Sequence, residues 1–355
     1  MRIFRRYLMR RILFMTALVM LVLCGLAMFL QFVSQLDDVG TGDFGMRQAL
    51  LYALLKLPNI AQLMMPMGVL LGALLGIGSV ANHSELIAIR SAGVSINRLA
   101  GAVLVTGVSL SLLTLVLSQY VGPPLDQFAR QYRAVAKHGE SSIGTGQSAW
   151  IRDGDTFLNV SGLSDDYQFG GIYMFRLGPG GLIEGIGRAE SAGVDESDKW
   201  VLNNFKETRF NGERIASEEA TTMTRPNALN PDLIGLTVIK PSILSGVALF
   251  RYMRYLQRND LDAKRYIVAF WSRIAAAVAV APMCVLALPF VIGRMRTSGT
   301  GGRMAIGLLI GLAYFLAGRA LADGSMVYDF NAVFVAWLPT LALTLVTMIA
   351  LARVR

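Results

Sequence analysis

The sequence predicts an α-helical membrane protein with six transmembrane helices and a β-jellyroll-like domain inserted between helices 3 and 4, on the outer side of the membrane. Two observations lead to this fold class. Of the 355 residues, 54% are apolar and only 16% are charged, whereas soluble domains carry about 25% charged residues. In addition, three long apolar segments precede a polar stretch of ordinary composition, and three follow it.

Each apolar segment approaches the roughly 20 residues that a helix needs to cross a hydrocarbon core. The first has no small-residue cleavage site and is too long for the apolar part of a signal peptide, so we expect the mature protein to keep it. The predicted spans are Ile12–Val33, Ile60–Val80, Leu99–Val121, Ile274–Ile292, Ala305–Leu321 and Ala332–Leu351. They divide the chain into residues 1–121 with helices 1–3, residues 122–265 with the polar domain and its helical connectors, and residues 266–355 with helices 4–6.

Arginine is distributed unequally between the two sides of these spans. Cytoplasmic segments of membrane proteins are enriched in Lys and Arg, so both termini are predicted to be cytoplasmic and the polar domain to lie outside. The residues from Val121 to Arg265 hold 17 basic and 18 acidic side chains, so the net charge of +9 reflects topology and does not indicate nucleic-acid binding. Twelve arginines face the single acid Glu85 on the predicted cytoplasmic side: Arg2, Arg5, Arg6, Arg10, Arg11, Arg90, Arg98, Arg294, Arg296, Arg303, Arg353 and Arg355.

The polar domain changes from helical spans to short β-type runs. Several short strands with turn signals between them favour a sandwich or a jelly-roll, and Asn211-Gly212 predicts a hairpin. Such a domain could be a lid, a binding groove, a docking edge or a structural spacer. We expect helical connectors at Gln127–Lys137, after Pro123 and Pro124 end span 3, and at Ser245–Gln257. The expected strands are Ser148–Arg152, Thr156–Gly162, Gly171–Leu177, Leu182–Ala192, Trp200–Phe210 and Arg214–Met223.

The chain has no motif for chemistry of its own. It lacks the G-x-x-x-x-G-K-[ST] phosphate loop and the G-x-S-x-G nucleophile elbow. Its two histidines, His83 and His138, fall on opposite sides of the predicted membrane, so no two-His metal site is expected. Cys24 and Cys284 lie inside spans and predict no disulfide in the polar domain. We therefore expect no catalytic residues, no metal site and no bound cofactor, and an energy source outside this chain.

The segment between spans 2 and 3 predicts a short helix near residues 82–93 on the cytoplasmic face. Asn82 and Glu85 have the spacing of a capping box, and Gly93 suits a helix end. In one interpretation Glu85 only caps this helix. In the other, the helix couples to a cytoplasmic partner, because a positively charged face gives no reason for a lone acid. The residues expected to contact that partner are Glu85, Leu86, Ile89, Arg90, Ala92 and Gly93.

Here the sequence resembles the LptF/LptG family of lipopolysaccharide export permeases, over nearly the whole chain. The motif S-E-L-x-A-x-R-x-A-G-V-S (residues 84–95) looks like the coupling helix of that family. L-P-x-x-x-x-x-x-x-P-x-x-x-L-L-G-A-L-L-G-x-G (57–78) matches the second span, F-W-S-R-I (270–274) the start of the fourth and A-L-P-F-V-x-G-x-x-R (287–296) its end. The motif Q-L-D-D-V-G-T-G-D-F-G (35–45) is closer to the LptG than to the LptF members.

The resemblance implies a non-catalytic subunit of an ATP-driven exporter in the inner membrane of a Gram-negative bacterium. The implied partners are an LptF-like permease subunit, an LptB-like ATPase dimer that uses ATP and Mg, a single-span LptC, an LptA-like periplasmic bridge and lipopolysaccharide. The β-jellyroll domain would then be periplasmic. Two other classes compete with this interpretation: a membrane assembly or scaffold factor that binds a periplasmic partner, and a membrane enzyme that acts on lipid.

Five residues are expected to contact lipid. Spans 1, 2 and 5 should line an apolar chamber, with Phe29 and Met67 facing lipid. Several family members carry lysines at the outer end of span 1, where this chain has Gln31, Asp37 and Asp38. Acids there would repel phosphate unless a divalent cation bridges them. The headgroup phosphates are instead expected at Arg130, Arg133 and Lys137, which share one helical face.

Overall fold

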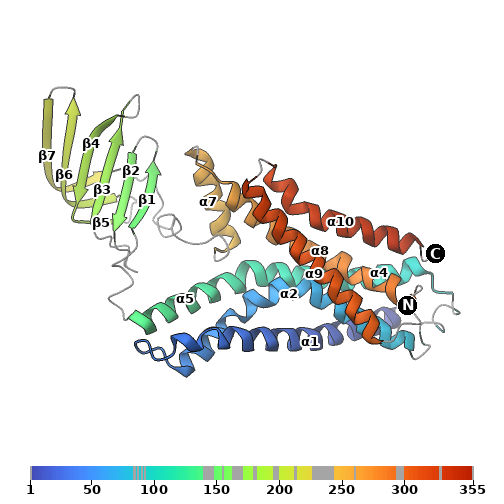
Figure 1. Cartoon of the computed structure of the whole chain (residues 1–355). Coiled ribbons are helices and arrows are strands. Elements are labelled where there is room, and N and C mark those ends of the chain that lie inside the picture. Colours follow the sequence, from blue (N-terminus) through green and yellow to red (C-terminus); the bar gives the residue numbers. More distant parts are fainter. Residues whose placement is uncertain are drawn as a thin grey trace.

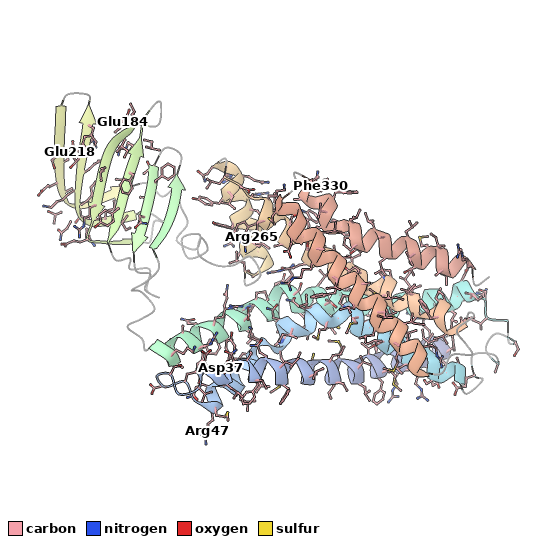
Figure 2. All side chains as sticks on the ribbon, viewed as in Figure 1. Asp37, Arg47, Glu184, Glu218, Arg265 and Phe330 are labelled. Carbon is pink, nitrogen blue, oxygen red and sulfur yellow. The ribbon has the colours of Figure 1, made fainter. Side chains whose placement is uncertain are left out.

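A computed structural model describes residues 2–82, 85, 88, 91, 93–138, 148–153, 156–161, 171–178, 182–194, 200–211, 214–225, 244–259, 261–292, 300–327 and 330–353. These residues form a helical bundle with an antiparallel sheet beyond one of its ends (Figure 1). Both chain termini lie at the opposite end of the bundle. The side chains of Asp37, Arg265 and Phe330 lie toward the end that carries the sheet (Figure 2); we call this the sheet end and the other the terminal end.

Within the described residues, 6 helices are long and apolar enough to cross a membrane. Each overlaps one predicted span, so the prediction of six transmembrane helices is confirmed. They are α1 (Arg2–Val33), α2 (Met46–Asn82), α4 (Ile96–Val116) continued by α5 (Gly122–His138), α8 (Lys264–Ile292), α9 (Thr300–Val327) and α10 (Ala332–Arg353).

The third span does not end at Pro123 and Pro124, as the sequence indicated. A π-helical turn, Leu117–Val121, joins α4 to α5, and the Gly122 N–H donates to the Leu117 carbonyl. Proline lacks an N–H and clashes with the preceding helical turn, and the wider π turn places both prolines at the start of α5 without a break. The chain therefore continues without a helix break from α4 in the bundle to the charged residues of α5.

Helices α1 and α2 are in close contact along a row of small residues in α2. A Cβ atom at Gly72 would lie 2.4 Å from the Cα of Thr16, and one at Gly76 would lie 3.0 Å from the Cα of Ile12. Small residues let membrane helices approach closely, which increases van der Waals packing where lipid removes the hydrophobic driving force. Gly72 and Gly76 of the L-L-G-A-L-L-G-x-G motif thus let α1 pack closely against α2.

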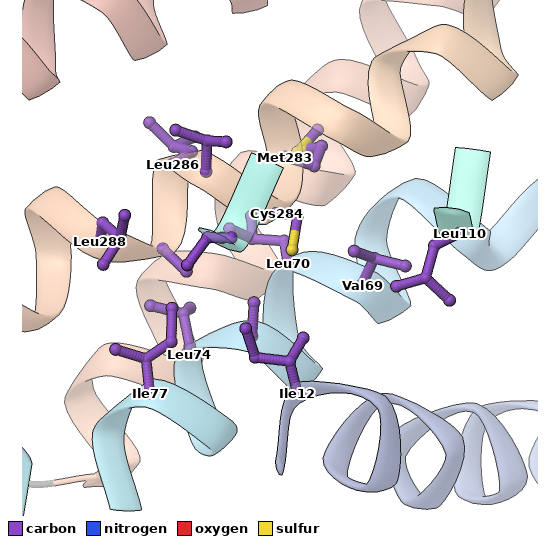
Figure 3. Packing of buried hydrophobic residues seen from close by; sticks show 14 of the residues in the cluster. Ile12, Val69, Leu70, Leu74, Ile77, Leu110, Met283, Cys284, Leu286 and Leu288 are labelled. Atoms are coloured by element: carbon purple, nitrogen blue, oxygen red, sulfur yellow. The ribbon is translucent and has the colours of Figure 1, made fainter. Parts of the chain in front are cut away.

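Helix α8 packs against α2, α4 and α10 and forms the centre of the bundle. Figure 3 shows side chains of the buried apolar cluster that this packing forms, among them Met283 and Leu286 of α8, Leu70 and Leu74 of α2, and Leu110 of α4. In contrast, only 17% of the apolar window in α1 and 11% of that in α9 are buried within the chain, against 72% in α2. The outward faces of α1 and α9 are therefore left for lipid or for another subunit.

The described residues of the polar domain form seven strands in one antiparallel sheet: β1 (Ser148–Asp153), β2 (Thr156–Ser161), β3 (Ile172–Leu177), β4 (Ile183–Ala189), β5 (Ser191–Val194), β6 (Trp200–Asn211) and β7 (Arg214–Arg225). Six expected runs account for these seven strands. The predicted hairpin at Asn211 is confirmed, because Asn211 pairs with Arg214. The described strands form one sheet, and its closure into a jelly-roll stays a prediction.

The expected run Leu182–Ala192 is two strands, because the chain bends at Glu190. Strands β4 and β5 lie one after the other along the same side of β6. Opposite the bend, Asn204 has φ 51°, a left-handed conformation that Asn tolerates better than most residues. The Asn204 Nδ2 donates to Glu190 Oε2 at 2.8 Å, so the two residues stabilise the bend together.

One face of the sheet changes from apolar to charged along its length. Met174 and Phe205 belong to an apolar cluster that includes Tyr252 of α7 (Gly246–Arg258), the helix that leads back to α8. Farther along β6, the buried Glu207 pairs with Arg176 at 2.8 Å and with Arg209 at 3.1 Å. The hydrogen bond to Glu207 raises the pKa of Arg209, so this guanidinium stays charged.

Candidate functional site

The connector between α2 and α4 contains Glu85, the acid expected to couple this chain to a partner. The Tyr7 hydroxyl donates to Glu85 Oε2 at 2.9 Å, and the Arg11 guanidinium lies 5.4 Å from the centre of the Tyr7 ring. Glu85 therefore has a tertiary partner on α1, which a helix cap alone does not require. Gly93 has φ +84°, the left-handed conformation that ends a helix. The expected contact residues Leu86, Ile89, Arg90 and Ala92 lie outside the described residues.

The cationic stripe of α5, which consists of Arg130, Arg133 and Lys137, is paired with carboxylates of this same chain. Arg130 forms an ion pair with Asp126 at 3.2 Å. Arg133 and Lys137 both form ion pairs with Asp38. The three side chains thus share one region, as expected, but each has an acidic partner.

The loop after α1 brings Asp38 to the stripe. The Asp43 N–H donates to the Ala136 carbonyl at 2.8 Å, which holds this loop against the end of α5. The ring of Tyr52 in α2 lies 5.4 Å from the Arg133 guanidinium and 5.1 Å from the Lys56 ammonium. Asp38 therefore supplies countercharge to the stripe, and a phosphate that binds Arg133 or Lys137 would have to compete with it.

A cavity of about 350 Å³ lies between α2, the end of α4, α8, α9 and α10. Met67, the expected lipid contact in span 2, lines this cavity; Phe29 does not, and its side chain is 61% exposed on α1. Helix α9 approaches α2 closely at Gly311, where a Cβ would lie 2.4 Å from Met67 Cγ. Nearer the sheet end, Gly318 has no atom within 4 Å of a Cβ position, so the two helices separate there and leave the space.

The sequence did not indicate several residues that line this cavity. Arg273, Tyr314 and Arg319 are polar lining residues that come from α8 and α9. In the sequence, Arg273 directly precedes the predicted span Ile274–Ile292, and Arg319 lies near the end of the predicted span Ala305–Leu321. That both residues line one cavity depends on how α8 and α9 pack, and no local sequence pattern encodes this packing.

The described residues contain no group of three or more His, Cys, Asp or Glu side chains able to hold a metal ion. In particular, Asp37 and Asp38 form no such cluster with other described acids. The expectation that this chain has no metal site and no catalytic residues stays a prediction.

Comparison with known proteins places these features in one family. The model of the family described as lipopolysaccharide export system permease LptF/LptG matches residues 6–353. The permease protein LptG of Escherichia coli K12 is 31% identical over 350 residues, which cover 98% of this chain and 97% of the relative. LptG of Haemophilus influenzae is 30% identical over 351 residues, or 99% of this chain and 98% of the relative.

The second permease of the same export system is a more distant relative. LptF of Escherichia coli K12 is 24% identical over 178 residues, or 50% of this chain and 48% of the relative. The likeness to LptG extends over the spans, the connector and the polar domain together. This chain belongs to the LptF/LptG family of lipopolysaccharide export system permeases.

Proposed function

We propose that this chain is the LptG-type transmembrane subunit of an ATP-driven lipopolysaccharide exporter in the bacterial inner membrane. It extracts lipopolysaccharide from the membrane and passes it to a periplasmic bridge. The observation that carries this proposal is the match to LptG proteins over 98% of the chain, because it includes the connector with Glu85 and the α2 segment with Met67. The apolar outward faces of α1 and α9 support it, since they suit a chamber shared with a second permease.

The proposed orientation places both termini in the cytoplasm and the sheet in the periplasm. The arginine asymmetry supports this orientation, as does the position of both termini at the end of the bundle opposite the sheet (Figure 1). The connector with Glu85 then lies on the cytoplasmic side, where an ATPase can reach it.

The proposed partners are an LptF-like permease, an LptB-like ATPase dimer that uses ATP and Mg, a single-span LptC and an LptA-like bridge protein. The sequence lacks a phosphate loop, so ATP hydrolysis is assigned to the separate ATPase. The exposed apolar side of α1, which includes Phe29 (61% exposed) and Leu21 (74% exposed), supports contact with a second membrane subunit or with lipid.

Co-purification tests the assignment. A tagged form of this chain, expressed with its partners in the native membrane, should retain an LptF-like permease and an ATPase. The ATPase activity of the purified assembly should respond to added lipopolysaccharide. If the tagged chain retains only periplasmic proteins and no ATPase, it is a scaffold factor instead.

A further inference from the structure

Helix α7 carries a row of exposed side chains that changes from apolar to basic along the helix. Its other side is buried: Tyr252 and Leu256 belong to the apolar cluster that includes Met174 and Phe205 of the sheet. Residues three and four apart lie on one side of a helix, and on the exposed side of α7 they are Val247, Phe250, Arg254 and Arg258. The described residues therefore leave one mixed face of α7 uncovered.

The apolar half of this row lies at the level of a membrane surface. The ring centre of Phe250 is 6.0 Å from that of Phe270 in α8, and the Phe270 ring is 5.6 Å from Trp271. The Trp271 ring lies 6.3 Å from Trp337 of α10. Tryptophan is enriched where the hydrocarbon core meets the headgroups, and both tryptophans lie in the sheet-end part of their spans. Phe250 thus adjoins this interface on its sheet-end side.

The start of α7 is fixed to the bundle at the same level. Arg273, two residues after Trp271, donates from Nη1 to the Leu244 carbonyl at 2.5 Å, and the Ser245 hydroxyl accepts a hydrogen bond from the Ala248 N–H at 3.2 Å. From this point α7 runs across the direction of α1 and α2 (Figure 1). A helix held in this way lies along the membrane surface and does not enter the hydrocarbon core.

The basic half of the row follows directly on this aromatic contact. The Arg254 guanidinium lies 4.9 Å from the centre of the Phe250 ring, and Arg258 is one turn farther, in the last turn of α7. Asp262 is the described acid nearest to Arg258 in sequence. It accepts a hydrogen bond from the Lys264 N–H at 2.8 Å, at the start of α8, where a helix favours negative charge. Two guanidinium groups therefore lie at headgroup height, with the forked donors that suit phosphate.

We propose that α7 is an interfacial helix that binds anionic phospholipid of the surrounding bilayer, with Arg254 and Arg258 on the headgroup phosphates and Val247 and Phe250 in the acyl boundary below them. Charge decides the occupant, because an anionic headgroup attracts both arginines, whereas a zwitterionic headgroup offsets its phosphate with its own ammonium. None of the described residues that line the cavity between α2 and α9 comes from α7. Bound phospholipid would hold the point where the chain returns from the sheet at the membrane surface, a role beyond the proposed export function.

Fluorescence quenching tests this surface in the assembled complex. A fluorescent amino acid replaces Val247, and the complex is reconstituted in phosphatidylcholine nanodiscs with a small fraction of phosphatidylglycerol or phosphatidylcholine that carries a spin label near the headgroup end of one acyl chain. Phosphatidylglycerol should quench at least about fivefold more than phosphatidylcholine, the enrichment that one arginine gives near an anionic surface. Equal quenching by the two lipids would overturn the proposal, and so would no quenching by either, since water or a protein partner would then cover the row.

A competition experiment identifies the source of the phosphate. Unlabelled lipid A should displace the spin-labelled phosphatidylglycerol no better than an equal amount of cardiolipin, which also carries two phosphates. Better displacement by lipid A would assign the row to the exported lipid and would overturn its assignment to phospholipid.

Matched variants test the two arginines. Arg254→Gln with Arg258→Gln should reduce quenching by phosphatidylglycerol to the phosphatidylcholine level. Both side chains are exposed, so their loss leaves the buried face of α7 intact. Arg47→Gln is the control, because Arg47 is also exposed at the sheet end but belongs to α2 (Figure 2), and it should leave quenching unchanged. An unchanged ratio between the two lipids in the double variant would contradict the phospholipid site, whether or not the complex exports lipopolysaccharide.

Discussion

Tyr7, near the start of α1, donates a hydrogen bond of 2.9 Å to Glu85 in the connector between α2 and α4. The two residues are 78 positions apart in the chain. Helix α1 also packs along α2 through Gly72 and Gly76, and its outward face is apolar. A partner that moves Glu85 would therefore move α1 through Tyr7. The bond thus offers a direct physical connection between the predicted coupling site and the predicted lipid chamber.

Removing this bond should weaken coupling without unfolding the bundle. Tyr7→Phe deletes the donor at a cost of about 1–2 kcal/mol for a partly exposed bond to a carboxylate. We expect ATP hydrolysis by the purified complex to continue while lipopolysaccharide release per ATP falls. Tyr120→Phe is the control, since Tyr120 is 71% exposed. An unchanged ratio of release to hydrolysis in Tyr7→Phe would show that the bond has no coupling role.

Charge reversal at Glu85 should weaken coupling more than Tyr7→Phe does. It removes the hydrogen bond to Tyr7 and also changes the charge that the connector presents to the partner. Glu85→Lys and Glu85→Ala are expected to detach or uncouple the ATPase, with a loss of docking affinity of about tenfold or more. Affinity capture of the ATPase measures this directly. Full complex yield and full transport in Glu85→Lys would reduce Glu85 to a helix cap.

The ion pairs of Asp38 with Arg133 and Lys137 predict that replacing the arginines and replacing Asp38 change lipid retention in opposite directions. Arg130→Glu with Arg133→Glu should reduce the lipopolysaccharide retained by the purified complex, because phosphate loses its cationic partners. Asp38→Asn should increase retention, because it frees Arg133 and Lys137 from their shared countercharge. Phosphate analysis of co-purified lipid checks both. If the two variants change retention in the same direction, the stripe only holds the loop after α1 against α5.

A side chain at Gly72 should separate α1 from α2. Gly72→Val places atoms against the Thr16 main chain, where even a Cβ would lie 2.4 Å away, and overpacking of this kind costs about 1–3 kcal/mol. We expect a lower midpoint of thermal unfolding in detergent. Gly101→Ala on α4, where no atom lies within 4 Å of the Cβ position, should match the parent protein. Equal midpoints for the two variants would contradict the close α1–α2 contact.

Accessible cysteines test the orientation. In a background with Cys24→Ala and Cys284→Ala, cysteine is introduced at Gly301 near the start of α9 or at Leu182 beside the sheet, which is 74% exposed. A membrane-impermeant maleimide added to intact cells with a permeable outer membrane should label Leu182→Cys and spare Gly301→Cys. The reverse pattern would invert the topology.

Local patterns predicted most of the elements. Length and apolarity located six spans, and alternation with Asn211-Gly212 located the strands, because both signals depend on neighbours in the sequence. The continuity of α4 and α5 was missed since Pro123 normally ends a helix, and only the π turn before it relieves the clash. The division of one expected strand at Glu190 depends on the left-handed Asn204 of another strand.

The site residues were harder to predict than the elements. Glu85 and Met67 were predicted from motifs, and their roles stay predictions. The structural partners Tyr7 and Asp38 were not predicted, because they lie 78 and 95 positions from Glu85 and Arg133. The spacing of Arg130, Arg133 and Lys137 correctly put them on one face and said nothing of the acids opposite. The cavity arises from the packing of five helical segments, and no local pattern encodes it.

Lipopolysaccharide release from reconstituted vesicles tests the central claim most directly. Vesicles that contain this chain, its LptF-like partner, LptC and the ATPase are supplied with lipopolysaccharide and ATP, and the soluble bridge protein is assayed for bound lipopolysaccharide. The account predicts ATP-dependent transfer that disappears when this chain is omitted and falls when it carries Glu85→Lys. Transfer at the full rate without this chain would contradict its role as an export permease.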